Sequence, residues 1–132
     1  MPPPLGKVPT KKMPNIQVFG TDDSPATRGA LRFFRERRIV VSYVDLAKKP
    51  IAAGELRRFT DKLGAAALLD TESRAYRDAG LAYLTTDTVG ITSRLLADAR
   101  LLRLPLVRYG DLVTAGKDEA TWRAWLARRP GA

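Results

Sequence analysis

Polar side chains gather in one loop of the chain, between a run of strand-forming residues and a run of helix-forming residues. Thr21, Ser24 and Thr27 supply hydroxyl groups there, and Arg28 supplies a cation one residue further on. The free backbone N–H groups at the start of a helix point toward such a loop and favour anions. Residues of these types at the start of a helix suit the binding of an anion such as a phosphate.

The same loop also has a purely structural explanation. Ser24 is a favourable N-cap residue, and Pro25 fits the first helical position, where a missing N–H costs nothing. Asp22 and Asp23 place two carboxylates beside the loop, and these would repel an oxyanion. The residues alone therefore leave open whether the loop is a ligand site or a well-capped junction between a strand and a helix.

The composition excludes several kinds of catalysis. The 132 residues include no cysteine and no histidine, which removes thiolate nucleophiles, disulfides, imidazole bases and conventional zinc sites. Ser24 has no general base at hand, because Asp22 and Asp23 are too acidic for that role. We therefore predict no catalytic residue, no metal and no resident cofactor.

The charge of the chain favours acidic partners. Its 23 basic and 14 acidic residues give a net charge of +9, which suits nucleic acid, an acidic protein surface or anionic metabolites. Arg28, Arg32 and Arg35 recur at helical spacing and share one helix face. This row is either a solvated helix face or a docking edge for a protein partner.

Nucleic-acid binding through the basic tail and the arginine-rich helices is an alternative. Proteins that bind single strands place stacking aromatic side chains among their charges. On the first helix we expect only Phe33, next to Arg32, to be exposed, whereas Trp122 and Trp125 are expected in the core of the last helix.

The N-terminal residues differ in composition from the rest. Residues 1–14 hold five prolines and three lysines without periodicity, so we expect a disordered basic tail followed by one domain at 15–129. No apolar run approaches the roughly 18 residues of a membrane span, and no apolar signal-peptide segment is present. We therefore expect a cytoplasmic protein that does not contact membranes.

Strand and helix signals place the polar loop in a strand–helix–strand unit. β-forming residues predict a strand that ends at Gly20, a helix is expected from Pro25 to about residue 37, and residues 39–46 read as a buried strand. The short connection between this helix and the second strand favours a parallel pair with a right-handed crossover.

The rest of the chain is expected to complete a mixed sheet. Helical segments without strands are predicted at 52–63, 65–70, 73–79 and 87–98. Two strands at 104–109 and 112–114, joined by the turn Gly110–Asp111, precede a last helix at 118–127. The order β-α-β, helical insert, β-β-α predicts an α/β, thioredoxin-like domain with a four-stranded mixed sheet.

Four segments in this order and spacing resemble the arsenate reductase (ArsC) and Spx family of thioredoxin-fold proteins. They are GTDDSPATRGAL, DLAKKPIAAGELRRFTDKLG, LLDTESRAYRDAGL and LLADARLLRLPLVRYGDLVTAGKDEATWRAWL. The resemblance covers about residues 16–126 and implies a bacterial, cytoplasmic protein. It also implies that Ser24 stands where the family has its nucleophilic cysteine, and that Thr27 stands where the Spx branch often has a second one.

Other departures concern the arginines that hold the oxyanion in the family's reductases. The resemblance places one near residues 69–72, where this chain has Asp70 and Glu72, one at Leu104 and one near Lys117. Three residues do follow the family's pattern: Arg28, Arg103 and Pro105, a proline that is typically cis in the family and borders its site. Together with the hydroxyl-bearing residues of the loop, they are the ligand candidates.

Three functions follow from these observations. The first is a redox-inactive ArsC/Spx-like module that binds a protein, with RNA polymerase or another transcription component as the partner that the resemblance implies. The second is an arsenate reductase-like homologue that retains glutathione or oxyanion binding at the Ser24 loop. The third is a nucleic-acid-binding protein.

Overall fold

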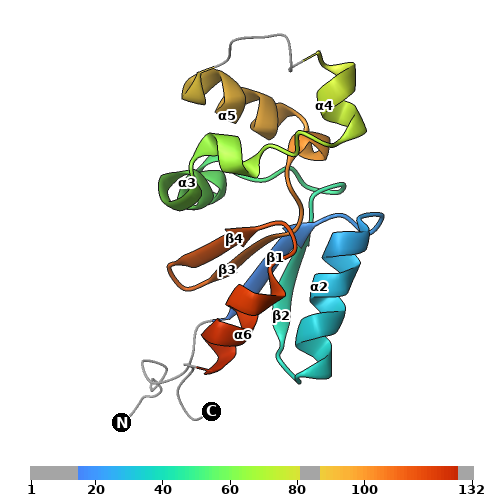
Figure 1. Cartoon of the computed structure of the whole chain (residues 1–132), viewed down its shortest axis with the longest axis vertical. Coiled ribbons are helices and arrows are strands. Elements are labelled where there is room, and N and C mark those ends of the chain that lie inside the picture. Colours follow the sequence, from blue (N-terminus) through green and yellow to red (C-terminus); the bar gives the residue numbers. More distant parts are fainter. Residues whose placement is uncertain (1–14, 81–86, 128–132) are drawn as a thin grey trace.

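A four-stranded mixed sheet forms the centre of the molecule (Figure 1). The computed structural model describes residues 15–80 and 87–127. The sheet has the order β2-β1-β3-β4, in which β1 (Ile16–Gly20) runs parallel to β2 (Val41–Asp45) and antiparallel to β3 (Leu106–Tyr109), and β4 (Leu112–Ala115) closes the hairpin. This topology confirms the α/β, thioredoxin-like prediction.

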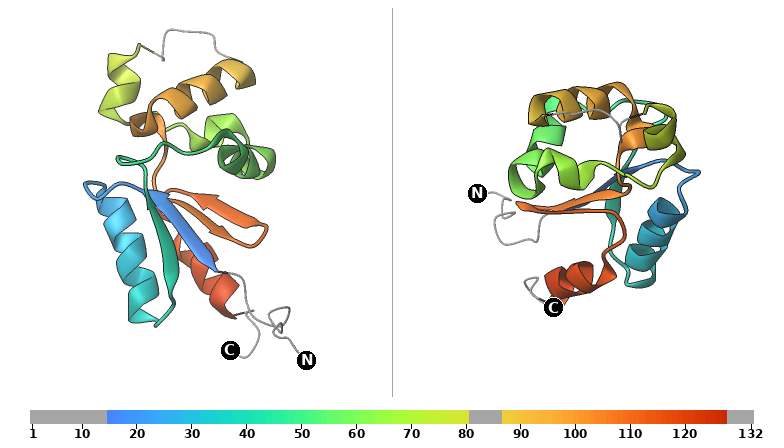
Figure 2. Two further views of the ribbon diagram at one scale, coloured as in Figure 1. Left: turned by 180° about the vertical axis from the view of Figure 1, so that it is seen from behind. Right: turned by 45° about the horizontal axis from the view of Figure 1, so that its top comes forward.

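Helices lie on both sides of this sheet, as the second view in Figure 2 shows. α2 (Pro25–Glu36) and α6 (Glu119–Ala127) cover one face. The other side holds the helical insert, which consists of α3 (Ala53–Leu63), η2 (Ala65–Leu68), α4 (Arg74–Asp78), α5 (Thr88–Ala97) and η4 (Ala99–Leu101). The predicted order of elements is thereby confirmed.

β1 joins two separate apolar clusters, because successive side chains of a strand point to opposite faces. Ile16 and Val18 pack with α2 and α6, where Phe34 and Trp122 are fully buried. Phe19 packs with the helical insert, and its ring meets Phe59 edge-to-face at 5.8 Å.

The first helix begins as its sequence predicts. Ser24 is the N-cap residue, and its side-chain oxygen accepts a hydrogen bond from the backbone N–H of Thr27 at 3.1 Å. The expectation that Phe33 is exposed was wrong, since only 4% of its surface is accessible. Its ring packs against Trp122 of α6 and lies under the guanidinium of Arg37.

The second strand differs from the prediction of a buried strand at 39–46. It spans only Val41–Asp45 and lies at the edge of the sheet, so Ser42 is exposed and the other strand residues are half-buried. The buried residues Ile39 and Leu46 flank the strand, while Val40 is 86% exposed. The chain turns at residues 37–38, where Arg38 has a φ of 60°, and the strand begins three residues later because residues 39 and 40 are not part of the sheet.

Two other predictions also changed in detail. The segment expected to be helical at 65–70 is a 3₁₀ helix that ends at Leu68, after which Leu69 forms an isolated bridge with Leu102. The hairpin turn at Gly110–Asp111 is confirmed, and Gly110 adopts a φ of 61°.

Some expectations fall outside the described part of the chain. These include the predicted disordered tail at 1–14 and the end of the predicted domain at 128–129. Within residues 15–80 and 87–127, no helix has the length and apolar character needed to cross a bilayer.

Candidate functional site

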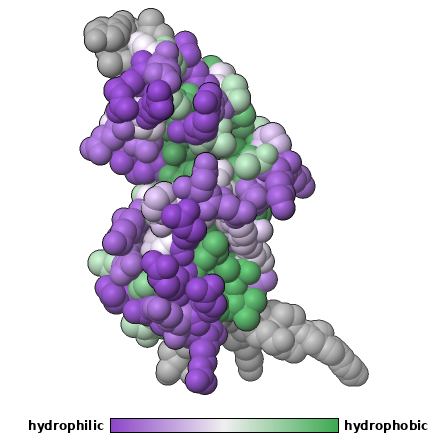
Figure 3. Space-filling model, turned by 90° about the vertical axis from the view of Figure 1, so that its right-hand side faces the viewer, coloured by the Kyte–Doolittle hydropathy of each residue, from purple (hydrophilic) through white to green (hydrophobic). Residues whose placement is uncertain are grey.

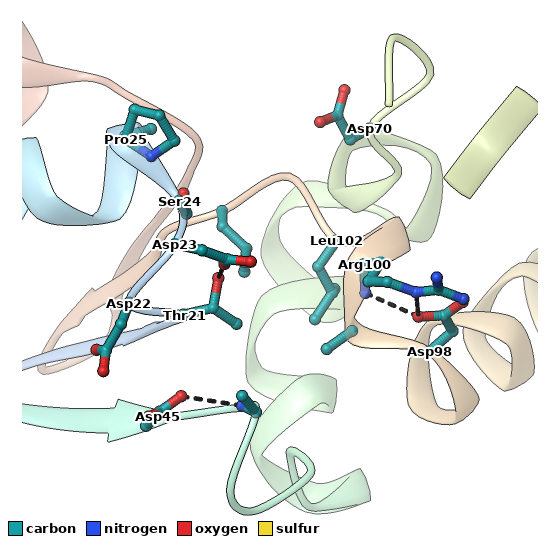
Figure 4. A pocket seen from close by; sticks show the side chains of 14 residues that line it. Thr21, Asp22, Asp23, Ser24, Pro25, Asp45, Asp70, Asp98, Arg100 and Leu102 are labelled. Atoms are coloured by element: carbon teal, nitrogen blue, oxygen red, sulfur yellow. Dashed lines mark hydrogen bonds and ion pairs between the residues drawn. The ribbon is translucent and has the colours of Figure 1, made fainter. Parts of the chain in front are cut away.

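An open cleft of about 960 Å³ lies where the parallel strands β1 and β2 end. Ligands commonly bind at the carboxyl ends of parallel strands in α/β folds. The loop 21–26 before and at the start of α2 forms one wall, and the segment 98–104 forms the opposite wall (Figure 4). Asp45, Ala47 and Asp70 complete the lining.

The cleft is strongly acidic. Five aspartates from four separate segments line it: Asp22, Asp23, Asp45, Asp70 and Asp98. Arg100 is the basic residue in the described lining, and it is already paired with Asp98. Its Nε and Nη2 donate to the two carboxylate oxygens of Asp98, each at 2.9 Å. The remaining aspartates make the cleft negative overall.

The two hydroxyls that line this cleft already have partners. Thr21 Oγ1 donates to Asp23 Oδ1 at 2.7 Å, and Ser24 Oγ accepts from the N–H of Thr27 as the helix cap. Of the ligand candidates from the sequence, Thr21 and Ser24 are the two that line the cleft.

Thr27 and Arg28 lie outside the lining of the cleft. The side chain of Thr27 is fully buried, packs against Gly20, and its Oγ1 has no hydrogen-bond partner among the described residues. Arg28 is exposed and donates from Nη1 to the carbonyl oxygen of Asp22 at 2.8 Å, which holds the loop against the first turn of α2.

Arg103 and Pro105 also lie outside the cleft. Arg103 Nη2 donates to the carbonyl of Leu69 at 3.1 Å and Nε donates to that of Ala67 at 3.3 Å, so this arginine connects η2 to the start of β3. Pro105 is buried, and the Leu104–Pro105 peptide bond is cis.

Sequence reasoning missed Tyr43, which fixes one of the loop carboxylates. Its hydroxyl donates to Asp22 Oδ1 at 2.8 Å across from β2. Burial, and then this hydrogen bond to Asp22, raise the pKa of Tyr43 well above its usual range. Alternate residues of a strand share a face. Tyr43 lies two residues after Val41, so the sequence places both on one face, and in the structure this is the face that α2 covers.

The arginine row predicted on the first helix is present. Arg28, Arg32 and Arg35 are all exposed on α2. Figure 3 views the side of the molecule that carries α2, and hydrophilic colour dominates its lower half beside one hydrophobic patch. No group of three or more acidic side chains in the described ranges is arranged to hold a metal ion.

The model of the ArsC family matches residues 12–125, which is most of the chain. The chain belongs to the ArsC family. No curated protein matches it.

Solved structures share the ArsC fold with this chain at low sequence identity. The protein YffB superimposes with a TM-score of 0.75 at 18% identity, over 83% of this chain and 97% of YffB. An arsenate reductase from Vibrio cholerae gives 0.71 at 14%, over 82% and 94% of the two chains. An arsenate reductase (ArsC) related protein from Brucella melitensis gives 0.65 at 16%, over 85% and 94%. These likenesses show the fold.

We expect the pKa of Asp98 in this ArsC-family protein to lie below the ordinary value of about 3.9 for aspartate. The hydrogen bond from Arg100 is the main cause, and it outweighs the opposing effect of burial. Because the folded-state pKa is depressed, this pair stabilises the fold above the unfolded pKa, and the contribution disappears as the pH falls through the folded pKa.

A carboxyl ¹³C NMR titration measures this pKa directly. In Arg100→Ala the pKa of Asp98 should move back toward the ordinary value. Arg74→Ala, which removes an exposed arginine from α4, should leave it unchanged. Equal pKa values of Asp98 in the unchanged protein and in Arg100→Ala would contradict the assignment.

Proposed function

We propose that this ArsC-family protein is a cytoplasmic, redox-inactive module that binds a protein partner and does not reduce arsenate by thiol chemistry. The charge of the cleft at the start of α2 carries this proposal. Five aspartates line it, and its arginine is engaged by Asp98. A site for arsenate needs the opposite charge.

A comparison of typical electrostatic energies favours the exclusion of oxyanions from the cleft. The N-terminus of a helix stabilises an anion by about 0.3–1 kcal/mol. Two like charges at 4 Å repel by roughly 1 kcal/mol even in water, and by more near a protein surface. Several carboxylates therefore outweigh the single helix terminus, and this argument applies equally to the carboxylates of glutathione.

The chemistry of Ser24 supports the same conclusion. A serine hydroxyl forms neither a thiolate nor a mixed disulfide at neutral pH, and the chain holds no histidine to act as its base. In addition, Ser24 Oγ accepts the capping hydrogen bond from Thr27. A nucleophilic role would require a proton acceptor more basic than the carboxylates of Asp22 and Asp23.

We propose that the partner docks on the exposed arginines of α2. Arg32 and Arg35 lie one turn apart and are exposed, and their guanidinium groups form no ion pair or hydrogen bond with the described residues. Such a row suits an acidic face on the partner. RNA polymerase or another transcription component is the partner we propose, on the resemblance to the Spx branch.

A reductase assay tests the loss of thiol chemistry. With arsenate, glutathione and glutaredoxin, we expect arsenite formation no faster than without the protein. Ser24→Cys should not restore activity, because the surrounding aspartates remain. NMR titration with arsenate and with glutathione should leave the amide signals of Thr21 and Ser24 in place. Turnover, or saturable shifts of these two signals, would favour the oxyanion or glutathione alternative instead.

Binding to purified RNA polymerase tests the partner. We expect a complex that survives nuclease treatment and that weakens by about tenfold or more in Arg32→Glu/Arg35→Glu. Arg57→Glu/Lys62→Glu, which makes the same change in charge on exposed positions of α3, should bind as the unchanged protein does. A complex lost on nuclease treatment would favour nucleic acid, and no complex would refute this partner.

A further inference from the structure

A second hollow, of about 290 Å³, lies between α2 and the start of α6. Both helices cover the same face of the sheet (Figure 1). Its lining contains four cationic side chains, from Arg32, Arg37, Lys117 and Arg123. Glu36 and Glu119 also line it, which leaves a surplus of two positive charges. We call this hollow the basic groove.

The wall of the basic groove is held in a fixed arrangement. The guanidinium of Arg37 lies 3.8 Å from the ring centroid of Phe33, and that of Arg123 lies 5.5 Å from it. Arg37 Nη1 also donates to the carbonyl of Phe33 at 3.0 Å. A guanidinium already fixed over an aromatic ring loses less conformational entropy when it binds a carboxylate.

Two of the cations remain available to a ligand. Arg32 and Lys117 are exposed, and the side chain of neither forms an ion pair or a hydrogen bond with the described residues. Arg123 is only loosely engaged, since its Nη2 lies 3.3 Å from Glu119 Oε1 at the surface. The basic groove therefore combines a fixed cationic wall with two cations that have no partner in the described part of the chain.

We propose that the basic groove binds a segment rich in aspartate and glutamate on the protein partner. This deepens the proposed function and rests on it, because it names the chemistry of the partner and extends the docking surface from the outer face of α2 to Lys117. The volume of about 290 Å³ lies at the lower limit of the roughly 300–1,000 Å³ of small-molecule pockets. It suits one or two inserted side chains better than a whole cofactor.

The neighbouring cleft restricts where such a segment can lie. The cleft and the basic groove share Pro25 and Ala26 in their linings. A segment rich in carboxylates is repelled by the five aspartates on the cleft side and attracted on the groove side. The charges thus confine an acidic segment to the basic groove and give it a defined limit along α2.

Two observations favour a peptide over nucleic acid as the occupant. The Phe and Trp side chains of the described chain are all buried, including Phe33 beneath Arg37, so none offers an exposed face for base stacking. Glu36 and Glu119 would also repel a continuous phosphate backbone. A peptide can place carboxylates beside the cations and neutral residues beside these glutamates.

NMR titration of the full chain with a deca-glutamate peptide tests the proposal. We expect saturable shifts of the amide signals of Gly29, Arg32 and Lys117, with none at Thr21 or Ser24, and weaker binding as salt is added. Arg32→Glu/Lys117→Glu should lower the affinity about tenfold or more. The matched variant Arg57→Glu/Lys62→Glu lies on the opposite side of the sheet and should lower it less than about threefold.

Each other outcome overturns part of the scheme in a recognisable way. Equal loss of affinity in both double variants would show that only net charge matters, and the basic groove would not be a site. Tighter binding of a ten-residue thymidine oligonucleotide at the same amides would replace the peptide with nucleic acid. Peptide binding in the groove without binding of RNA polymerase would refute that partner while leaving the groove intact.

Discussion

Gly20→Ala is expected to destabilise the fold by about 1–3 kcal/mol, as overpacking of a core does. Gly20 ends β1 directly beneath α2. A Cβ atom at this position would lie 2.3 Å from Thr27 Oγ1 and 2.5 Å from Thr27 Cγ2. Thr27 is fully buried, so its side chain cannot turn away into solvent. The added methyl group must therefore push α2 away from the sheet.

Urea unfolding with two further variants tests this explanation. Thr27→Ala in the Gly20→Ala background should recover part of the loss, because it removes the two closest atoms and keeps the Thr27 Cβ at 3.0 Å. Gly54→Ala on α3, where an added Cβ meets nothing within 4 Å, should be neutral or stabilising. An unchanged urea midpoint in Gly20→Ala would show that α2 lies further from β1 than these distances imply.

Trp122→Ala should cost more, about 3–5 kcal/mol, because it opens a large cavity. Trp122 is fully buried on α6, and its ring lies 5.5 Å from that of Phe33 and 5.4 Å from that of Phe34. Its Nε1 also donates to Thr114 Oγ1 of β4 at 2.9 Å, which connects the last helix to the edge of the sheet.

A second substitution separates packing from hydrogen bonding at this position. Trp122→Phe keeps much of the apolar volume but leaves the buried hydroxyl of Thr114 without its donor, which should cost about 1–3 kcal/mol. Far-UV circular dichroism during chemical unfolding measures both variants. A loss of less than about 1 kcal/mol in Trp122→Ala would contradict a core role for this residue.

The local pattern was sufficient to predict the order of elements. The strand before Gly20, the helix that Ser24 caps and the hairpin at Gly110 are each specified by residues close in sequence. The order of the strands in the sheet is not specified by such local residues. Residues 39–46 have the composition of a buried strand, yet β2 lies at the edge, because strand order depends on partners distant in the sequence.

The burial of Phe33 could not be predicted from its own helix for the same reason. Its cover comes from Trp122, about ninety positions away in the chain. The acidic cleft is a similar case. The sequence shows Asp22 and Asp23 as a pair, but Asp45 and Asp98 join them only through the topology of the sheet and insert. A hydroxyl side chain near the loop also does not reveal which way it points, and Thr27 is buried beneath the helix instead of lining the cleft.

The division of β1 between two apolar clusters has a consequence for how the molecule comes apart. Ile16 and Val18 belong to one cluster and Phe19 to the other. Neither the helical insert nor the pair α2 and α6 can detach without exposing side chains of this one strand. The domain should therefore behave as a single cooperative unit, and the amides of β1 should exchange with solvent only in the global opening reaction.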